Sequence, residues 1–506
     1  MKAYQDASLA PARRAKALLE EMTLAEKVGQ LNQRLYGFRI YERKCVNGED
    51  TIELSEEFRQ EVEKYSGLGV LYGLYRADPW ADKDYETGLI GVLSKKAYNQ
   101  VQRYVLEHSR LGIPVMMSSE CPHGHQALDG YLLPVNLLAG ATFDPAMVRA
   151  AYRVSGRQLQ NMGVDFALMS MLDVLRDPRW GRSEECYSED PYLSARMAEA
   201  AVIGMQESGP EVVAKHFAAQ GEGTGGVNAS AARIGERELR EIHFPPAAAA
   251  IKAGAKGIMA AYNEIDGVYC HANRWLLNDV IRKEMGFDGI VMSDGVAIDQ
   301  LDSMTGDNVV SGALALQSGV DVGLWDEAFG KLEEAVRRGL VKEAQIDQAV
   351  LRVLTLKFER GLFEHPYLEE EGEIHVDYAQ NPESVQLARE GLVILQNKNQ
   401  VLPFWENQAS GKKIAVVGPN ADDLYNQLGD YTPPLRMDDG ITVLDGMFDD
   451  AEAWGVDTLK GWIDNYESSR FTAIDSHTAV ITSEYNMEWL KEWLERCTPI
   501  AEKTEF

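Results

Sequence analysis

Five apolar runs in this chain of 506 residues end in polar residues of types that can do chemistry. They contribute carboxylates, a Lys–His pair and a phenol: Glu120, Asp173, Lys215 with His216, Tyr262 with Asn263, and Asp294. Each alone could be a structural polar group, but polar groups at the end of an apolar run are costly to bury unless they are paired or used. Five together therefore favour a shared polar site.

A site of this composition suits a sugar. Carboxylates and a guanidinium, such as that of the nearby Arg182, form bidentate hydrogen bonds with vicinal hydroxyls. Cleavage of a glycosidic bond commonly needs two carboxyl groups, one ionised and one protonated. The residue types thus suggest a glycosidase.

Seven nearly continuous apolar runs alternate with amphipathic segments and predict the elements that must position these residues. The runs are 67–73, 113–119, 164–174, 211–217, 256–262, 287–294 and 320–325. Such runs are typical of strands buried on both faces, and parallel strands need helical crossovers. The pattern predicts an α/β fold, a (β/α)8-type (TIM-like) barrel with an irregular eighth strand and an active site at the carboxyl ends of its strands. A doubly wound open sheet with a nucleotide site is the alternative.

The pattern changes after residue 362 and predicts three parts. Residues 1–362 form the predicted barrel, and the acidic, aperiodic residues 363–385 form a linker. Residues 386–506 predict a smaller α/β sandwich-like domain that is incomplete and atypical toward its end. A helix in 385–397 and a strand in 412–421 open it, and a further strand and an amphipathic helix close it.

Charge and composition exclude several classes of function. The chain has 50 Lys and Arg against 79 Asp and Glu, a net charge of −29 that repels polyanions, so we expect no nucleic-acid partner. No apolar run reaches the roughly 18 residues of a membrane span, and the N-terminus lacks a signal peptide pattern. We therefore expect no membrane association and a cytoplasmic location, with a secreted mature form as the alternative. The sequence leaves open whether the chain forms a homo-oligomer.

Neither a metal nor a cofactor is expected. The five cysteines are widely spaced and form no CxxC pair. Cys121, His123 and His125 lie close in sequence, but no second cluster completes a ligand set, so a structural role is favoured. Residues 221–226 match the motif G-x-G-x-x-G, but they lack the strand–turn–helix context that dinucleotide binding requires.

Several segments, in order along the chain, resemble glycoside hydrolase family 3. They are 177–193 (DPRWGRSEECYSEDPYL), 215–226 (KHFAAQGEGTGG), 236–246, 261–273 (AYNEIDGVYCHAN), 286–295 (GFDGIVMSDG), 356–368, 388–404 and 412–423. Together the similarity covers residues 11–446. It implies a barrel followed by a second α/β domain, and an oligosaccharide or other glycoside as substrate.

The resemblance also implies roles residue by residue. Asp294, in VMSDG, would be the nucleophile. The substrate-binding residues would be Glu120, Arg182, Lys215, His216, Met259 and Tyr262. The two permanent cations of this set are expected to lower the pKa of Asp294 and keep it ionised. The activity implied is that of a retaining, exo-acting β-glycosidase with a covalent glycosyl-aspartate intermediate. A β-glucosidase is favoured, with a β-xylosidase or another specificity of the family as the alternative.

Three features depart from the family pattern. Gly295 stands where many relatives carry Trp, so a wall of the sugar site must come from elsewhere. The loop 218–230 contains no His, which disfavours the N-acetylglucosaminidase-like branch. The larger branch takes its acid/base Glu from the second domain, which this chain does not resemble beyond residue 446. Glu484, after an apolar run, is the first candidate for the acid/base and Glu222 the second. The alternative from another class is a sugar-binding protein that lacks the acid.

Overall fold

The computed structural model describes residues 2–372, 380–400, 402, 416, 418–436 and 440–446, together with the backbone of 469–475 and 478–483. The chain divides into two compact units. The first comprises Met1–Leu392 and Asp430–Pro434, and the second comprises Val393–Gly429 and Leu435–Phe506. Glu484 and most of the strand predicted in 412–421 lie outside the described residues.

Six parallel strands form the central sheet of the first unit. In spatial order they are β10 (Ile290–Met292), β7 (Gly257–Ala260), β6 (Glu211–Phe217), β5 (Phe166–Ser170), β4 (Met116–Glu120) and β3 (Val70–Tyr72). Nearly every strand residue is buried, as expected for strands covered on both faces. The prediction of an α/β fold with a parallel sheet is confirmed.

Two irregular segments join the edges of this sheet. Residues 320–325 bridge to β10 through Val322 and Met292, and residues 31–36 bridge to β3 through Tyr36 and Tyr72, both in parallel. Backbone N–H groups of residues 323 and 325 donate to the carbonyl oxygens of residues 31 and 33, at 3.0 and 2.9 Å. Parallel β-structure therefore runs around a ring of eight segments, and the open doubly wound alternative is wrong.

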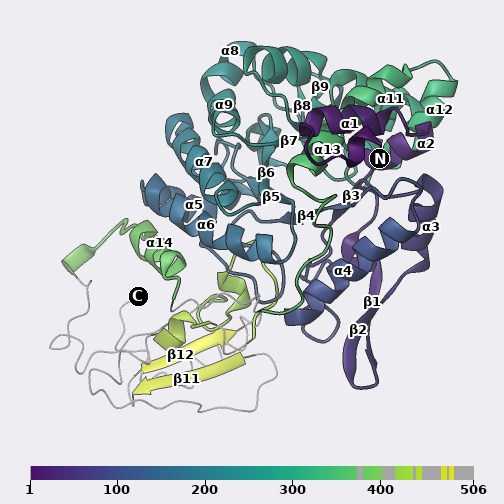
Figure 1. The fold of residues 1–506 in the computed structure, drawn as a ribbon. Helices are drawn as coiled ribbons and strands as arrows, with labels where there is room; N and C mark the ends of the chain where they lie inside the picture. Colours follow the sequence, from purple (N-terminus) through teal and green to yellow (C-terminus); the bar gives the residue numbers. More distant parts are fainter. Residues whose placement is uncertain are drawn as a thin grey trace. The chain divides into compact units, whose positions relative to one another are not determined.

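Helices cover the outer side of this ring (Figure 1). The longer ones are α1 (Pro11–Leu19), α3 (Glu56–Tyr65), α4 (Gly91–Glu107), α6 (Pro145–Asn161), α7 (Pro191–Gln206), α9 (Phe244–Lys252), α11 (Asn308–Ser318) and α13 (Glu343–Glu359), with a π-helix η8 (Trp275–Glu284) between β7 and β10. The shorter ones are α2 (Leu24–Gln30), α5 (Asn136–Ala141), α8 (Glu236–Glu238), α10 (Asp302–Thr305) and α12 (Leu332–Arg337). Aspartates 144, 190 and 307 cap the helices α6, α7 and α11 through backbone N–H groups.

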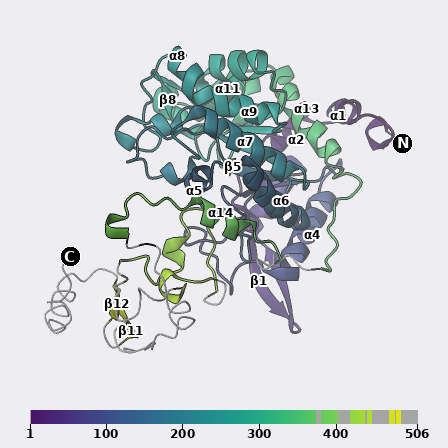
Figure 2. The same ribbon diagram turned by 90° about the vertical axis from the view of Figure 1, so that its left-hand side faces the viewer.

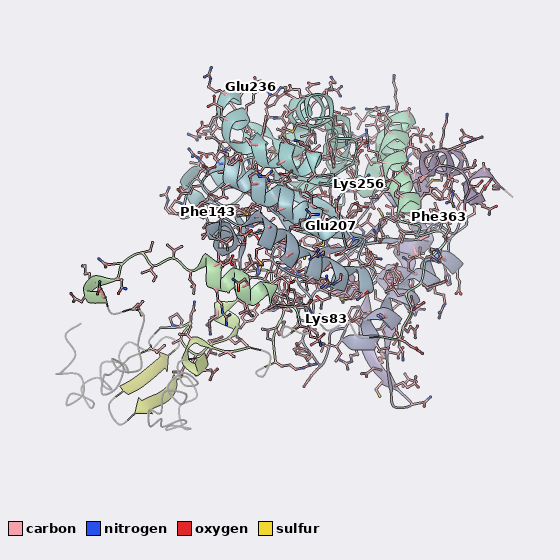
Figure 3. All side chains as sticks on the ribbon, turned by 60° about the vertical axis from the view of Figure 1, so that its left-hand side comes forward. Lys83, Phe143, Glu207, Glu236, Lys256 and Phe363 are labelled. Atoms are coloured by element: carbon pink, nitrogen blue, oxygen red, sulfur yellow. The ribbon has the colours of Figure 1, made fainter. Side chains whose placement is uncertain are left out.

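The outer helices pack on one another as well as on the sheet. Helix α7 contacts both α6 and α9, and Figure 2 shows these three side by side. Glu207 after α7 and Glu236 at the start of α8 are exposed (Figure 3). Hydrophobic side chains of the strands and inner helix faces form one continuous core. The ring is therefore a packed barrel, and its polar residues gather at its carboxyl-end loops.

Among the described residues, three small sheets and one helix are not part of this barrel pattern. Two hairpins belong to the first unit: β1 (Tyr41–Val46) with β2 (Glu49–Leu54), and β8 (Glu264–Ile265) with β9 (Val268–Tyr269). Helix α14 (Glu383–Gly391), which the sequence placed at the start of a second domain, packs on α5 and α6 within the first unit. In the second unit β11 (Ser469–Asp475) pairs antiparallel with β12 (Thr478–Ser483). No helix in the described part of the chain is both long and apolar enough to span a membrane.

Candidate active site

Asp294 lies just past β10, at the carboxyl end of the sheet, and is 8 % exposed. Its Oδ1 accepts a hydrogen bond from the backbone N–H of Gly295 at 2.8 Å, and its own backbone N–H donates to Nε2 of His271 at 3.1 Å. Its Oδ2 accepts no hydrogen bond from the described residues and lies 3.8 Å from Nε2 of His216. One buried carboxylate oxygen of Asp294 is therefore left without a hydrogen-bond partner among the described residues.

Lys215 in β6 and Glu120 at the end of β4 form a buried ion pair. Nζ of Lys215 lies 2.6 Å from Oε2 of Glu120, and Oε1 of Glu120 accepts the hydroxyl hydrogen of Tyr72 at 3.0 Å. The face of the Tyr431 ring lies 4.6 Å from the same Nζ. Because an ammonium has three N–H donors, Lys215 keeps donors for a ligand after its pairing with Glu120.

His216 is held from both sides, which fixes its tautomer. Its Nδ1 lies 2.8 Å from Oδ2 of Asp173, and its Nε2 lies 3.0 Å from Nη2 of Arg182. Since a guanidinium only donates, Nε2 accepts and Nδ1 carries the hydrogen. Burial, together with the nearby Arg182 and Lys215, lowers the pKa of His216 well below its ordinary value. The imidazole is therefore neutral, and burial raises the pKa of its partner Asp173 to about 6.

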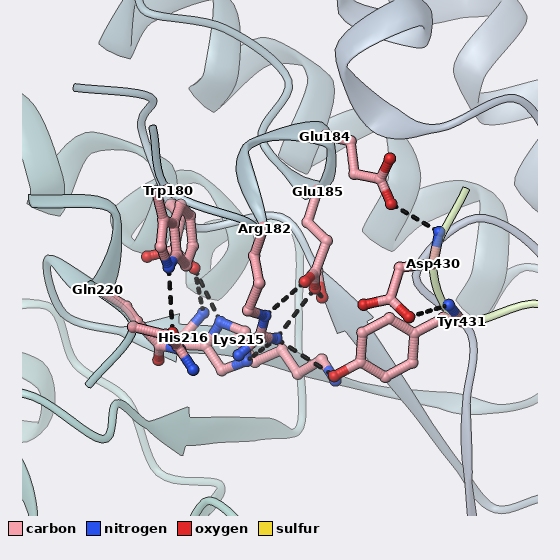
Figure 4. A network of polar contacts seen from close by, with 12 residues as sticks. Trp180, Arg182, Glu184, Glu185, Lys215, His216, Gln220, Asp430 and Tyr431 are labelled. Atoms are coloured by element: carbon pink, nitrogen blue, oxygen red, sulfur yellow. Dashed lines mark hydrogen bonds and ion pairs between the residues drawn. The ribbon is translucent and has the colours of Figure 1, made fainter. Parts of the chain in front are cut away.

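Arg182 is the centre of the polar network drawn in Figure 4. Its Nε and Nη2 bind the two oxygens of Glu185 at 2.5 and 3.1 Å, and Nη2 also donates to the hydroxyl of Tyr431 at 3.2 Å. Although burial opposes ionisation, Arg182 holds the pKa of Glu185 at about 2. This bidentate pair fixes the guanidinium plane against His216.

Tyr431 is a site residue that sequence reasoning missed. The backbone N–H of the preceding Asp430 donates to Oε1 of Glu184 at 2.6 Å, and the Asp430 carbonyl accepts from Nε2 of His123. These contacts hold segment Asp430–Pro434 on the first unit (Figure 4). Residues so distant in sequence carry no local signal, so only the folded chain identifies Tyr431.

The charge balance around Asp294 differs from the expectation. Arg182 and Lys215 do favour its ionised form, as predicted, but burial outweighs them and raises the pKa of Asp294 to about 6. Removing a carboxylate from water penalises its charged form, and two neighbouring cations compensate for only part of that cost. The predicted net lowering of this pKa is therefore wrong in direction, while the carboxylate is still ionised at neutral pH.

The two residues of the M-x-x-Y motif lie at different depths. Met259 is in β7, paired with Met292 of β10, and is fully buried in the core. Tyr262 follows β7, and burial together with the Asp294 carboxylate raises the pKa of its hydroxyl. The phenol is thus brought next to the Asp294 carboxylate, whereas the Met259 side chain is part of the hydrophobic core.

Trp325 provides the aromatic wall beside Gly295. A Cβ built on Gly295 would lie 2.5 Å from Cε3 of Trp325, so no larger residue fits there without moving the indole. The backbone N–H of Trp325 donates to the carbonyl of Gln33, which fixes this position at the ring closure. Sequence reasoning missed this residue, although it ends the predicted run 320–325 just as the other candidates end theirs.

Two aspartates couple the loops that carry Asp294 and Trp325. Asp326 accepts the hydroxyl hydrogen of Ser293 at 2.6 Å and backbone N–H groups of residues 298 and 299 at 2.8 and 3.2 Å. In return, Asp299 accepts backbone N–H groups of residues 327 and 328, both at 2.9 Å. Each carboxylate therefore holds the neighbouring loop, which limits independent motion of Asp294 and Trp325.

In the part of the chain that the structure describes, neither of the two candidate proton donors lies beside Asp294. Glu484 lies outside them. Glu222 pairs with Arg176 at 3.2 Å and lies 3.4 Å from His243, and these two neighbours lower its pKa. A carboxyl that is paired and ionised at neutral pH is a poor acid, so Glu222 is disfavoured.

The two histidines that the sequence places near Cys121 contact other protein groups. Nδ1 of His123 contacts the carbonyl of Leu133 at 2.8 Å, and Nε2 of His125 contacts the hydroxyl of Ser119 at 2.8 Å. No group of three or more His, Cys, Asp or Glu side chains in the part of the chain that the structure describes could hold a metal ion.

Comparisons with protein families match two segments. The model of the glycosyl hydrolase family 3 N-terminal domain matches residues 23–356, which include the six strands of the central sheet and the site residues from Glu120 to Trp325. The model of a domain of unknown function matches residues 432–505.

Among individual proteins, a putative beta-xylosidase of Formosa agariphila is 33% identical over 441 residues, which are 83% of this chain and 55% of that protein. A periplasmic beta-glucosidase of Salmonella typhimurium is 33% identical over 451 residues, 85% of this chain and 53% of that protein. The chain thus spans about half the length of these curated relatives.

Solved structures show the same similarity. A beta-glucosidase of Erythrobacter marinus superposes with a TM-score of 0.83 at 29% identity, over 99% of this chain and 65% of that one. A beta-glucosidase of Listeria innocua in complex with glucose superposes with a TM-score of 0.73 at 27% identity, over 94% of this chain and 61% of that one.

Proposed function

Because the chain belongs to glycoside hydrolase family 3, we propose that it is a retaining, exo-acting β-glycosidase with Asp294 as its nucleophile. The observation that carries this proposal is the unpartnered Oδ2 of Asp294, a buried carboxylate oxygen that Arg182 and Lys215 favour in its ionised form. A carboxylate fully engaged in ion pairs, as Glu120 and Glu185 are, could not attack carbon without first breaking those pairs.

In the proposed reaction Oδ2 of Asp294 attacks the anomeric carbon while the bond to the leaving oxygen breaks. The leaving oxygen takes a proton from the general acid, for which we propose Glu484. Water then hydrolyses the glycosyl ester, and the sugar leaves with retained configuration. Lys215, Arg182 and neutral His216 bind the sugar hydroxyls, and the hydrogen bonds that strengthen as charge develops lower the barrier.

For the sugar itself we propose a terminal β-glucosyl unit, with a β-xylosyl unit as the second candidate. The buried pair of Lys215 and Glu120, with the Tyr431 ring against it, suits one terminal ring rather than an internal unit of a chain. The relatives named above include both a beta-glucosidase and a putative beta-xylosidase, which supports keeping both sugars.

Hydrolysis of aryl β-glucosides and β-xylosides with good and poor leaving groups tests this function. We expect both kinds of leaving group to be hydrolysed, with faster turnover of one sugar series. Product configuration, followed by NMR during the first turnovers, should be retained. Release of the inverted sugar, or no turnover of any β-glycoside, would contradict the proposal.

A sugar-binding protein without the acid is the second candidate function. It is favoured by the pairing of Glu120, Glu185 and Asp173 with cations or His216, which leaves none of these three as a free donor. In that case only activated leaving groups would be cleaved, since they need little protonation, and added azide would accelerate turnover and form a β-glycosyl azide.

The pH dependence of kcat/KM should have an acidic limb near pH 6. Asp294 must be ionised to attack, and because its pKa is raised to about 6, activity is expected to rise with pH through that value. Rates on an activated aryl glycoside between pH 4 and 8 measure the limb. Asp173 has a similar pKa, so the limb should persist in Asp173→Asn if it belongs to Asp294; its disappearance would reassign it.

A further inference from the structure

Two residues in the loops around Asp294 have a backbone conformation that their side chains disfavour. Val296, two positions after Asp294, has a φ of 61°, and Trp325 has a φ of 64°. This left-handed region is costly for residues other than glycine, and most of all for a β-branched residue such as valine. Such a conformation persists only where surrounding contacts impose it. The contacts that impose it here therefore also bear on where the Asp294 carboxylate lies.

The Asp326 carboxyl contacts the Asp294 loop on both sides of the nucleophile. Asp326 is 1% exposed, and its Oδ2 lies 2.6 Å from Oγ of Ser293, the residue directly before Asp294. Its Oδ1 accepts the backbone N–H groups of Ile298 and Asp299, at 2.8 and 3.2 Å. One buried carboxyl group thus ties the loop at its beginning and at its end.

Asp326 also fixes the segment that carries Trp325. The backbone N–H of Leu324 lies 3.1 Å from Oδ2 of Asp326 and 2.7 Å from Oγ of Ser293. The carbonyl oxygen of Leu324 in turn accepts the backbone N–H of Val296 at 2.8 Å. The carboxyl group therefore holds both positions with positive φ, since Val296 is bonded to Leu324 and Trp325 directly precedes Asp326.

These contacts do not depend on the charge of Asp326. Burial raises the pKa of Asp326 to about 8, so the group is mainly a neutral acid at neutral pH. In that form Oδ2 donates its proton to Oγ of Ser293, which still accepts the backbone N–H of Leu324, and Oδ1 remains an acceptor. Asparagine has the same donor and acceptor groups as this neutral acid, whereas alanine has neither.

We propose that Asp326 is a positioning residue for the nucleophile: it holds the surrounding loop in the conformation in which Oδ2 of Asp294 has no hydrogen-bond partner among the described residues. This inference rests on the proposed function. Asp326 acts through the neighbours of Asp294, because in the part of the chain that the structure describes it makes no hydrogen bond with Asp294 itself. A shift of the attacking oxygen by about 1 Å is enough to slow a reaction by about a hundredfold.

Asp299 offers a matched control, because its carboxylate holds the opposite loop. It accepts the backbone N–H groups of Glu327 and Ala328, both at 2.9 Å, and an amide hydrogen of Asn308 at 2.9 Å. None of these three partners is a neighbour of Asp294 in the sequence. Loss of the Asp299 carboxylate should therefore destabilise the fold and leave the nucleophile in place.

Formation of a covalent adduct tests the proposal at the nucleophile itself. The probe is β-glucosyl fluoride, or its xylosyl analogue, with a second fluorine in place of the hydroxyl next to the anomeric carbon. Its fluoride leaving group needs no acid, so the rate of labelling, followed by intact-protein mass spectrometry, measures attack by Asp294. We expect Asp326→Ala to lower the rate at saturating probe about a hundredfold, with the half-saturating concentration changed less than about threefold. Asp326→Asn should stay within about threefold of the wild type in both quantities.

Two further variants keep this test decisive. Asp299→Ala should lower the labelling rate less than about threefold, although it lowers the midpoint of denaturant unfolding as Asp326→Ala does. Ser293→Ala removes one contact of Asp326 and should lower the rate about tenfold, which gives a result even where Asp326→Ala does not fold. Equal losses in the two aspartate-to-alanine variants, a loss in Asp326→Asn as large as in Asp326→Ala, or a wild-type rate in Ser293→Ala would overturn the proposal.

Amide hydrogen exchange separates failure of this proposal from failure of the proposed function. The backbone N–H groups of Ser293 and Val296 donate to carbonyl oxygens of segment 320–325 rather than to Asp326. Their exchange should be about tenfold faster in Asp326→Ala than in the wild type or in Asp299→Ala. If the wild type forms no adduct with either fluoride but this difference is found, the loop is positioned as proposed and the catalytic proposal fails. Unchanged exchange at both amides in Asp326→Ala would contradict the positioning role.

Discussion

Asp294→Asn is expected to lower kcat/KM on every glycoside by roughly four orders of magnitude or more, because it removes the atom that forms the covalent intermediate. An amide oxygen of similar shape is a much weaker nucleophile than a carboxylate. The binding residues keep their contacts, since Lys215 pairs with Glu120 and Arg182 pairs with Glu185 rather than with Asp294. Steady-state rates with activated and unactivated aryl glycosides measure the loss, and affinity for the monosaccharide product checks that the pocket is intact.

The same position offers a chemical control. In Asp294→Ala, added azide can enter the vacated space and attack the anomeric carbon from the face that the aspartate used. The product should then be the α-glycosyl azide, whereas azide rescue of a missing acid yields the β-azide. A variant at position 294 that retains the wild-type rate, or that yields the β-azide, contradicts the assignment of the nucleophile.

Stability should change in the opposite direction to activity. The pKa of Asp294 is raised from 3.8 to about 6 in the folded chain, so above pH 6 its charge is held at a cost that the unfolded chain does not bear. Asn removes this cost and is expected to stabilise the fold at pH 7 by up to about 3 kcal/mol. The difference should shrink as the pH falls from 6 toward 4 and vanish well below pH 3.8, where the carboxyl is neutral in both the folded and the unfolded chain. Denaturant unfolding of both proteins at pH 4 and 7 tests the sign.

Arg182→Met should have the second largest effect, because it removes the cation shared by Glu185, His216 and Tyr431. Activity is expected to fall by roughly two to three orders of magnitude, as for loss of a charged group that stabilises the transition state. Stability is expected to fall by about 3–5 kcal/mol at pH 7, since Glu185 is left buried and unpaired. The loss of stability should shrink as the pH falls, because Glu185 without Arg182 takes up a proton more readily than in the wild type.

Arg179→Met is the control for this change. Arg179 lies three residues earlier in the same loop, but its side chain is 71% exposed and its partner Asp177 is outside the polar network, whereas the Arg182 side chain is 14% exposed. We expect wild-type activity and stability from Arg179→Met, because exposed ion pairs contribute little. Equal losses in the two variants would show a general effect of loop charge instead of the specific contacts of Arg182.

Local patterns in the sequence predicted most of the polar residues of the candidate site. Glu120, Lys215, Tyr262 and Asp294 each end a buried run, and the barrel brings such ends together at one rim. That inference requires only hydrophobic periodicity and the convergence of parallel strands. Segment 31–36 was not predicted, because its contribution to the ring is a bridge and a few backbone hydrogen bonds, with no long apolar run.

Other features of the candidate site depend on contacts between residues that are far apart in the sequence. Tyr431 reaches Arg182 from 249 positions away in sequence, and Trp325 fills the space beside Gly295 from a different segment of the ring. The pKa of Asp294 is a balance between burial and two cations, and the net sign follows only from how deeply the carboxylate is buried. None of these quantities has a counterpart in local sequence spacing.

The amino-acid sequence by itself determined the parallel strands and the family resemblance, because strand burial and motif identity depend on neighbouring residues. Through that resemblance it also indicated the carboxylate that we propose as the nucleophile. The tertiary structure alone decided which oxygen of Asp294 lacks a hydrogen-bond partner among the described residues, which carboxylates pair with cations and where the aromatic ring of Trp325 lies. These depend on distances of a few ångströms between residues from separate loops, and such distances exist only after the ring has closed.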